Sequence, residues 1–510
     1  MSRLNIPCGN IFDKSNPLLY ISCPMIKDST QDITWVKSCH PYLTSDTYRL
    51  LGNQGDLRKH SYHFVGIGGI GMSAIAQILR GQGHTVSGSD RNHDRKITPE
   101  VFQKLQSQGI SLYPQNGSGV EQNTDFIVIS SAIEDDNPDI RKAIALNRNI
   151  IKRADLLSEM FNANYGIAVG GTNGKTTVSS LVGYILDCAG LSPTIIVGGC
   201  IKNYVNNTYL GNAKAGTSDI ISIEADESDG SITLYKPRIS VITNISKDHK
   251  TIGELSKLFT TFSEKTTDTL VINADCPNLR ELNLSHKNVI TYGLNNDANI
   301  NAKGIVCKPF QSTFNVNGKS FEINLPGIYN IHNALASIAV ARWLKINDNV
   351  IATSLKNFMG VQRRMDVIGE VNGIRVIDDY AHNPEKISAV INAVKLGCKR
   401  IIAIFQPHGY IPASFMKEEF INAFIKVLSS NDVLFMPEIY YAGGTTNKSI
   451  SSAEFVSRIK EGGRNAFFVE DREDIIPEIK RLAHSGDCIL VMGARDYTLT
   501  EFCHKILHLL

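Results

Sequence analysis

A glycine-rich segment followed by lysine and threonine carries the clearest chemistry in this 510-residue sequence. The segment follows an apolar run that predicts a buried strand, Tyr165 to Val169, and precedes a predicted helix, Val178 to Leu186. A strand, a glycine loop and a helix bind triphosphate, because backbone N–H groups can turn toward the phosphate oxygens. We expect Lys175 to contact the β- and γ-phosphates and the Thr176 hydroxyl to reach Mg²⁺. The expected nucleotide-binding residues of this loop are Gly171, Thr172, Asn173, Gly174, Lys175, Thr176 and Thr177.

This loop is shorter than the usual phosphate-binding pattern. The spacing G-x-x-x-x-G-K-[ST] would need glycine where Val169 stands, so the segment is a G-T-x-G-K-T variant. A glycine turn beside a surface lysine is the alternative interpretation, and the strand and helix on either side argue against it.

Another glycine loop, which is the first along the chain, lies about a hundred residues earlier. It fits G-x-G-x-x-G, follows the apolar strand Tyr62 to Val65 and opens a helix, Met72 to Leu79. An acid follows the next strand about twenty residues on, which is the layout of a dinucleotide-binding fold. The pattern predicts nucleotide or diphosphate binding but does not separate NAD from a UDP-linked molecule, and a glycine turn that serves only packing remains the alternative. The residues concerned are Gly66, Gly68, Gly69, Gly71 and Asp90.

Two polar segments that follow apolar strands are candidate metal ligands. Glu224 begins an acidic run after Ile220 to Ile223, and a carboxylate at a strand end downstream of a phosphate loop is where a Mg²⁺ ligand is expected. His249 ends the polar exit of the next strand and could ligate a second cation. A solvated acidic loop and a surface histidine are the alternatives.

Three further residues could face a nucleotide. Asn330 and Asn333 lie three positions apart at a predicted helix start, so their amides could face an adenine edge or cap the helix. Asp379 lies in a run of paired acids, histidine and proline after a strand, which fits a nucleotide or metal edge or an Asx turn.

Short β-rich runs alternate with helical stretches from Tyr62 onward, which predicts parallel sheets covered by helices. The expected fold class is α/β with three domains: an N-terminal Rossmann-like domain, a central P-loop-type ATPase domain and a C-terminal Rossmann-like domain. The expected boundaries are 1–60 for an N-terminal extension of unknown structure, then 61–157, 158–360 and 361–510.

Composition excludes several classes of protein. The net charge of +2 implies no bulk attraction to nucleic acid or to an anionic membrane. No apolar run approaches the ~18 residues needed to span a bilayer, and the first residues lack the features of a signal peptide. The ten cysteines include no C-x-x-C pair, so neither a zinc site nor a disulfide framework is indicated and a reduced cytoplasm is expected.

The order of these segments over about 430 residues resembles the Mur ligase family, the ATP-dependent amide-forming ligases of peptidoglycan precursor synthesis. The closest matches are Gly66–Met72, Ser87–Asp90, Gly198-Gly199, Glu224–Asp229, Gly360–Arg364 and Phe405–His408. The resemblance covers everything except the first ~60 residues.

The resemblance implies a ligase that uses ATP and Mg²⁺ to join an amino acid, expected to be L-alanine, to the lactyl carboxylate of UDP-N-acetylmuramate through an acyl phosphate. It implies that the first glycine loop holds UDP and that Lys175, Glu224, His249 and Arg364 are catalytic. It further implies that Thr176, Glu224 and His249 ligate metal, and that Asn330, Asn333 and Asp379 approach ATP. The implied partners are UDP-N-acetylmuramate and an amino acid, and the sequence does not decide between monomer and dimer.

The chain departs from the branch of the family that it resembles most. That branch usually has histidine where Asn173 and Tyr329 stand, and it usually shows Gly-His-His in the segment that here runs from Asp378 to Pro384. After His408 it usually continues Arg-Tyr-Thr-Arg, whereas this chain reads Gly409-Tyr410-Ile411-Pro412, so two cations expected near the amino acid are absent. Arg495, where the family usually has glycine, is a candidate replacement. A ligase with another acceptor, such as another amino acid or a recycled peptide, and a non-catalytic nucleotide-binding homologue are the alternatives.

Overall fold

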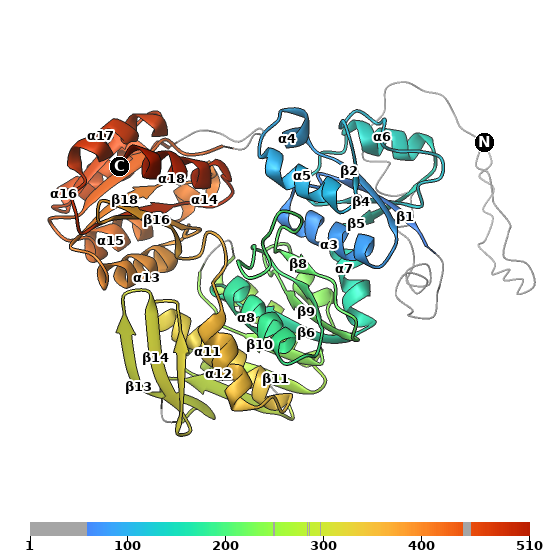
Figure 1. Cartoon of the computed structure of the whole chain (residues 1–510), viewed down its shortest axis with the longest axis horizontal. Coiled ribbons are helices and arrows are strands. Elements are labelled where there is room, and N and C mark those ends of the chain that lie inside the picture. The colour runs from blue at the N-terminus through green and yellow to red at the C-terminus, as the bar shows by residue number, and fades with distance from the viewer. Residues whose placement is uncertain (1–58, 248–249, 283, 285, 296, 442–449) are drawn as a thin grey trace, which may run out of the picture. The chain divides into compact units, whose positions relative to one another are not determined.

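The computed structural model describes residues 59–510 apart from 248–249, 283, 285, 296 and 442–449. Nearly all of the extension expected at 1–60, and the candidate ligand His249, therefore lie outside the described residues. The described residues form three sheets that follow one another along the chain (Figure 1). Helices alternate with the strands of each sheet, so the predicted α/β fold class is confirmed.

The N-terminal sheet is parallel, in the order β3-β2-β1-β4-β5. This order places the β1 end, and the glycine loop that follows it, at the centre of the sheet, as expected for a Rossmann-like domain. The strands are β1 (Ser61–Val65), β2 (Thr85–Ser89), β3 (Ser111–Tyr113), β4 (Phe126–Ile129) and β5 (Asn149–Lys152). The helices are α3 (Ile70–Gly81), α4 (Arg91–Asp94), α5 (Pro99–Ser107), α6 (Pro138–Ala145) and α7 (Arg153–Asn162).

The central sheet has the order β15-β14-β13-β12-β11-β10-β6-β9-β7-β8. Strands β6, β7 and β9 to β13 pair in parallel, whereas β13, β14 and β15 pair antiparallel with one another and β8 pairs antiparallel with β7. The strands are β6 (Tyr165–Gly170), β7 (Thr194–Ile196), β8 (Ala213–Lys214), β9 (Ile220–Glu224), β10 (Ile239–Ile242), β11 (Thr269–Asn273), β12 (Val289–Gly293), β13 (Ile300–Lys308), β14 (Gln311–Val316) and β15 (Lys319–Ile323). The helices are α8 (Lys175–Cys188), α9 (Ile252–Glu264), α10 (Pro277–Glu281), α11 (Ile328–Trp343) and α12 (Asp348–Asn357), with a 3₁₀ turn η2 (Ser231–Leu234).

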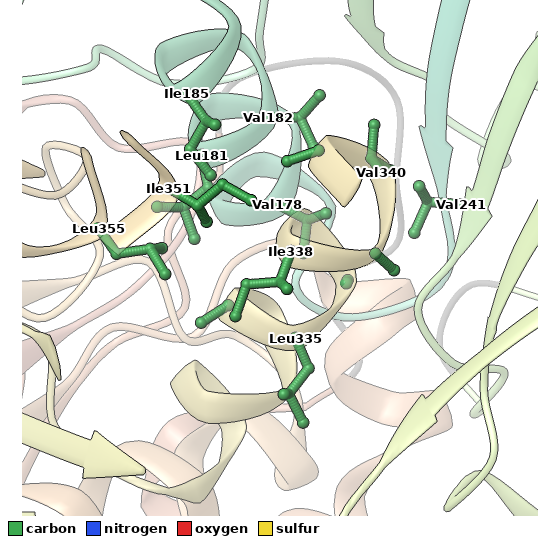
Figure 2. Packing of buried hydrophobic residues seen from close by; sticks show 14 of the residues in the cluster. Val178, Leu181, Val182, Ile185, Val241, Leu335, Ile338, Val340, Ile351 and Leu355 are labelled. Atoms are coloured by element: carbon green, nitrogen blue, oxygen red, sulfur yellow. The ribbon is translucent and has the colours of Figure 1, made fainter. Parts of the chain in front are cut away.

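The core of this region fixes the helix that follows the phosphate loop. Apolar side chains of α8 pack against those of α11 and α12, and β10 contributes Val241 (Figure 2). Each fully buried Leu, Ile or Val contributes on the order of 1.5–3 kcal/mol, so α8 is held firmly in place. The labelled residues of this core are Val178, Leu181, Val182, Ile185, Val241, Leu335, Ile338, Val340, Ile351 and Leu355.

The C-terminal sheet has the order β16-β17-β21-β18-β19-β20, parallel except for the β16–β17 hairpin. One apolar cluster lies between this sheet and α13, α15 and α16, and a second lies between the sheet and α17 and α18. The strands are β16 (Asp366–Val371), β17 (Ile374–Asp379), β18 (Arg400–Phe405), β19 (Val433–Pro437), β20 (Asn465–Val469) and β21 (Asp487–Met492). The helices are α13 (Pro384–Lys395), α14 (Tyr410–Phe415), α15 (Lys417–Val427), α16 (Ser452–Glu461), α17 (Ile475–Leu482) and α18 (Thr498–Leu509), with a 3₁₀ turn η3 (Arg472–Asp474).

Helix starts differ in a way that bears on function. Helices α9 and α16 begin with complete capping boxes, in which Thr251 is the N-cap residue of α9 and Ser451 is that of α16. Helices α3, α8 and α11 instead begin after glycine, at Gly69, Gly174 and Gly327, with no side-chain cap. Their first N–H groups therefore donate to no capping side chain and are available to donate to an anion or another acceptor.

Candidate active site

The loop between β6 and α8 requires glycine at two positions. Gly171 and Gly174 have φ angles of +125° and +88°, which favour glycine. A Cβ atom on Gly171 would collide with the Thr243 side chain, and one on Gly174 would lie 2.6 Å from Asn333 Oδ1. The loop thus passes closely between β10 and the start of α11, which gives its backbone a fixed path.

Residues after β10 hold this loop from the side. Strands β6 and β10 pair in register, with Ile242 beside Gly170. The Asn173 N–H donates to Asn244 Oδ1 at 2.9 Å, and the Asn173 carbonyl accepts from Thr243 Oγ1 at 2.6 Å. These hydrogen bonds fix the conformation of the loop through Asn173 and leave the first N–H groups of α8 out of the contact.

Lys175 lies at the start of α8 against the acidic segment that follows β9. Its Nζ is 2.8 Å from Glu227 Oε2 and 4.0 Å from Asp226 Oδ1. Burial disfavours the charged amine, but the carboxylates of Glu227, Asp226 and Glu224 outweigh burial and raise the pKa of Lys175. Burial also raises the pKa of Glu227, against the attraction of Lys175. The pair places a charged ammonium at the loop, where a phosphate could replace the carboxylate.

Thr176 and Glu224 bring hard oxygen atoms together beside the loop. Thr176 Oγ1 donates to Glu224 Oε1 at 3.0 Å and accepts from Arg364 Nη2 at 3.2 Å. The other carboxylate oxygen, Oε2, accepts the Gly198 N–H at 2.8 Å. Mg²⁺ prefers one or two such protein oxygens together with phosphates and water, so this donor set fits Mg²⁺. Among the described residues, no three His, Cys, Asp or Glu side chains gather around one point as metal ligands.

Arg364 and Asp379 come from the start of the C-terminal region. The Arg364 guanidinium lies 4.5 Å from the centroid of the Tyr380 ring, a cation–π contact that directs it toward Thr176. Asp379 accepts the N–H groups of Met365 and Ala381, each at 2.7 Å. Burial raises the pKa of Asp379 to about 6, although these hydrogen bonds and the charge of Arg364 oppose the shift.

A cavity of about 510 Å³ joins these groups. Its lining includes the predicted residues of the phosphate loop from Thr172 to Thr177, together with Glu224, Asn330, Asn333, Arg364 and Asp379. Gly171 lies behind this lining, against β10. Most of the predicted nucleotide-binding residues that the structure describes therefore surround one space.

The two asparagines of α11 line the cavity and also bond each other. Asn330 Nδ2 donates to the Pro326 carbonyl at 2.8 Å, and Asn333 Nδ2 donates to Asn330 Oδ1 at 3.1 Å. His332 extends the wall through a contact between its Nε2 and Asp275 Oδ2 at 2.8 Å. The Asn330 amide thus joins the Leu325–Gly327 turn to α11, and both asparagines remain on the cavity wall.

The first glycine loop is a separate group of predicted residues. Gly66 has a φ of +80°, and the N–H groups of Gly66 and Ile67 donate to the Ser89 carbonyl. Asp90 Oδ2 accepts the Gly68 N–H at 2.9 Å, while Oδ1 caps α4 through Asn92. Asp90 therefore braces the loop. Gly69 and Gly71 lie at the start of α3, where a Cβ on Gly71 would lie 3.1 Å from the Arg153 guanidinium.

Several residues of the cavity were not singled out from the sequence. Glu227, Asn244, Tyr380 and Glu385 contact the loop or Arg364 from distant positions in the chain. Glu227 lies in the acidic run that pointed to Glu224, and Asn244 directly follows a predicted strand, so both had a sequence signal. Glu385 had none, because its contact with Asn173 depends on the C-terminal region.

The segment after β18 lacks cations, as its sequence indicated. Gly409 has a φ of +70° and opens α14, in which Tyr410 is buried and Ile411 is exposed. His408 and Arg495 line the cavity from this side. The arginine on this wall of the cavity is therefore Arg495, which follows β21, and not a residue of α14.

Comparison with known families matches most of the chain. Residues 61–165 match the family described as Mur ligase family, catalytic domain. Residues 169–341 match the Mur ligase middle domain, and residues 363–495 match the Mur ligase, glutamate ligase domain.

Curated relatives and solved structures agree with these matches. A UDP-N-acetylmuramate--L-alanine ligase of Geotalea daltonii is 38% identical and covers 85% of this chain and 94% of its own length. The protein of that name in Aquifex aeolicus is 37% identical and covers 88% of this chain and 98% of its own length. The crystal structure of UDP-N-acetylmuramate-alanine ligase from Thermotoga maritima is 27% identical, with a TM-score of 0.72 over 88% of this chain and 98% of that chain. A murein peptide ligase from Psychrobacter arcticus shares the fold, with a TM-score of 0.63 over 88% of this chain and 98% of that chain. It is 23% identical in sequence.

Proposed function

This chain belongs to the Mur ligase family, and we propose that it joins L-alanine to UDP-N-acetylmuramate at the expense of ATP. Three relatives that are 35% to 38% identical over most of the chain carry the name of that ligase. The observation that carries the proposal is the cavity in which Lys175, Thr176, Glu224 and Arg364 converge. The reaction is the amide-forming step that adds the first amino acid to this peptidoglycan precursor.

The chemistry begins with activation of a carboxylate. An oxygen of the lactyl carboxylate attacks the γ-phosphorus of ATP, so that ADP leaves and an acyl phosphate forms. The amine of L-alanine then attacks the carbonyl carbon, phosphate leaves with the C–O bonding electrons, and the amine proton passes to solvent. Phosphate is a far better leaving group than oxide, which is why ATP is needed.

Residues of the loop and of the cavity around it have separate roles in this scheme. Lys175 exchanges Glu227 for the β- and γ-phosphates, and Arg364 neutralises the transferring phosphoryl group. Thr176 and Glu224 would hold Mg²⁺, which offsets the charge of the phosphate oxygens when bound. Asn330, Asn333 and Asp379 would line the nucleotide, and His249 remains a proposed ligand of a second cation.

The first glycine loop would hold the UDP moiety. Gly66 and Gly68 allow the backbone to approach a diphosphate, Asp90 fixes the loop, and α3 begins without a side-chain cap. The proposed domains remain 61–157, 158–360 and 361–510, although residue 157 falls within α7. The second boundary falls at Gly360, whose φ of +88° suits a hinge.

The proposed substrates place the enzyme in the cytoplasm, where ATP and nucleotide sugars are available. No helix in the described part of the chain is both long and apolar enough to cross a membrane. A recycled peptide is the second candidate for the acceptor. The reason is that α14 contains no lysine or arginine, whereas the alanine-adding ligases usually have two arginines in this segment.

An acceptor panel tests the proposal. The full chain is incubated with ATP, Mg²⁺, UDP-N-acetylmuramate and one acceptor at a time, and ADP and the ligated product are measured together. We expect L-alanine to give the highest kcat/KM and expect Lys175→Met to reduce kcat about 100- to 1,000-fold. If the enzyme prefers a peptide, the proposed acceptor L-alanine is wrong. If ADP forms at the same rate without the acceptor and without UDP-N-acetylmuramate, the chain is not a ligase.

A further inference from the structure

A free amino acid must be held by its carboxylate while its amine attacks. That carboxylate is charged at neutral pH, and moving it from water into a cavity is costly unless a cation receives it. Arginine suits this role best, because its planar guanidinium can donate two parallel hydrogen bonds to a carboxylate. If the proposed function holds, such a cation must lie on the cavity wall beyond the phosphate site.

The cavity lining includes four lysine and arginine residues in the described part of the chain: Lys175, Arg364, Lys386 and Arg495. Lys175 pairs with Glu227, and Arg364 donates to Thr176 at the phosphate end. Lys386 Nζ lies 3.4 Å from the imidazole of His382. The Arg495 guanidinium, in contrast, has no hydrogen-bond or ion-pair partner among the residues that the structure describes. It is therefore the arginine of this lining that is available for a new anion.

The backbone holds Arg495 in an unusual conformation. Its φ is +62°, a left-handed value that favours glycine. The residues on either side are fixed, because Ala494 is buried and Asp496 accepts Arg472 Nη1 at 2.5 Å and Thr498 Oγ1 at 2.6 Å. A large cationic side chain thus occupies a rigid turn in which glycine would be less strained, and such a cost at a cavity points to a role in binding.

Tyr380 relates this turn to the phosphate site. The Arg495 N–H donates to Tyr380 Oη at 3.3 Å, whereas the Arg364 guanidinium lies over the ring of the same tyrosine. The Arg495 backbone and the Arg364 side chain therefore contact the same tyrosine, one at its hydroxyl and the other at its ring. An amino acid whose amine faces the acyl phosphate beside Arg364 would have its carboxylate on the side of Arg495.

We propose that Arg495 binds the α-carboxylate of the incoming amino acid and thereby selects acceptors in which amine and carboxylate share one carbon. This assignment rests on the proposed ligase function and specifies its acceptor. A peptide acceptor, whose first residue carries an amide in place of this carboxylate, would lose the contact. The wall that contains Arg495 thus selects a free amino acid.

The Arg495→Gly variant tests the assignment with little risk to folding, because glycine suits the φ of this turn. Lys345→Gly is the matched control, since Lys345 is an exposed basic residue with a φ of +61° outside the cavity lining. Steady-state rates are measured with L-alanine and with L-alaninamide, which lacks the carboxylate. We expect Arg495→Gly to raise KM for L-alanine about 10- to 100-fold and to leave KM for ATP, KM for UDP-N-acetylmuramate and kcat/KM for L-alaninamide unchanged.

Added guanidinium ion should partly restore the KM for L-alanine in Arg495→Gly and have no such effect in Lys345→Gly. If the wild-type enzyme is active and Arg495→Gly has the same KM for L-alanine, the assignment of Arg495 is wrong while the proposed ligase function stands. Equal losses with L-alanine and L-alaninamide would also overturn it, since they would indicate a structural role. A wild-type chain that ligates no free amino acid would overturn the proposed function and this assignment together.

Discussion

The ion pair between Lys175 and Glu227 shows how a single residue can serve a site that must receive an anion. A buried ammonium without a partner would lose its proton, because burial disfavours charge. Glu227 keeps Lys175 charged, at 2.8 Å, and under the proposed function phosphates would take its place. The displaced carboxylate would then lie near the proposed Mg²⁺ ligands, Thr176 and Glu224, where a cation would offset its charge.

Asp379 makes the stability of the native state depend on pH. Its pKa in the folded chain is about 6, above the ordinary value of 3.8, because it is buried. Between about pH 4 and pH 6 the folded state therefore binds more protons than the unfolded state, and this group's contribution to stability falls as pH rises through that window. The difference between the two pKa values corresponds to a loss of about 3 kcal/mol in the free energy of unfolding across this window.

The Asp379→Asn variant mimics the protonated acid at all pH values. We expect its thermal midpoint, relative to that of the wild type, to rise between pH 4.5 and pH 7 and to change little above pH 7, in the absence of nucleotide. Asp366→Asn is a useful comparison, because Asp366 is a buried carboxylate of the same hinge with Lys202 as a close partner at 2.7 Å. A difference between wild type and Asp379→Asn that does not vary with pH would contradict the account.

At the scale of elements, the phosphate loop contacts the start of α13. Asn173 Nδ2 donates to Glu385 Oε2 at 2.7 Å, and Asn383 Nδ2 donates to Asn173 Oδ1 at 3.3 Å. Asn383 also caps α13 through the Lys386 N–H. The loop that would hold phosphate is thus bonded to the helix that begins after Asp379, and both elements line the cavity in which the acyl phosphate would form.

Removal of this contact should admit water to the acyl phosphate. In Asn173→Ala we expect the ratio of ADP formed to amide product to rise about 2- to 10-fold, as suits the loss of one or two modest hydrogen bonds. Glu419→Gln serves as control, because the Lys247–Glu419 pair also links the two regions but is exposed and should contribute little. A ratio that remains at unity in Asn173→Ala would show that the contact does not exclude water.

The sequence predicts parallel strands that are long apolar runs, but it does not predict the antiparallel strands β13 to β15. Strands such as β6 and β10 are continuous apolar runs, because helices cover both faces of a parallel sheet. Strands β13 to β15 instead alternate buried and exposed positions, or end in exposed ones, and were not expected. Alternation of this kind, short and interrupted, is a weak signal without the hairpin partner that stabilises it.

The site shows the same division between local and distant information. Lys175, Thr176 and Glu224 follow from spacing within one strand–loop–helix unit or at one strand end, so the sequence could indicate them. The bond between Asn173 and Asn244 spans 71 positions and requires the β6–β10 register. The contact between Arg364 and Thr176 spans 188 positions and requires the hinge at Gly360. Neither register nor hinge angle is encoded in a local pattern.

At the scale of the whole molecule, the described residues bring three kinds of binding element together in one chain. The first sheet carries the loop proposed to hold UDP, the second carries the loop proposed to hold ATP, and the third region contributes Arg364 and Arg495 to the cavity. A buried hydrogen bond from Gln77 to Asn212, at 2.9 Å, joins α3 to the segment before β8. Such an arrangement suits a reaction in which a nucleotide sugar, ATP and an amino acid must meet.

Isotope transfer tests the central claim most directly. UDP-N-acetylmuramate labelled with ¹⁸O in both oxygens of the lactyl carboxylate is incubated with the full chain, ATP, Mg²⁺ and L-alanine, and mass spectrometry follows product and phosphate together. The account predicts a product heavier by one alanyl residue that retains one ¹⁸O, and a released phosphate that carries the other. Unlabelled phosphate, or labelled phosphate without an alanyl product, would contradict it.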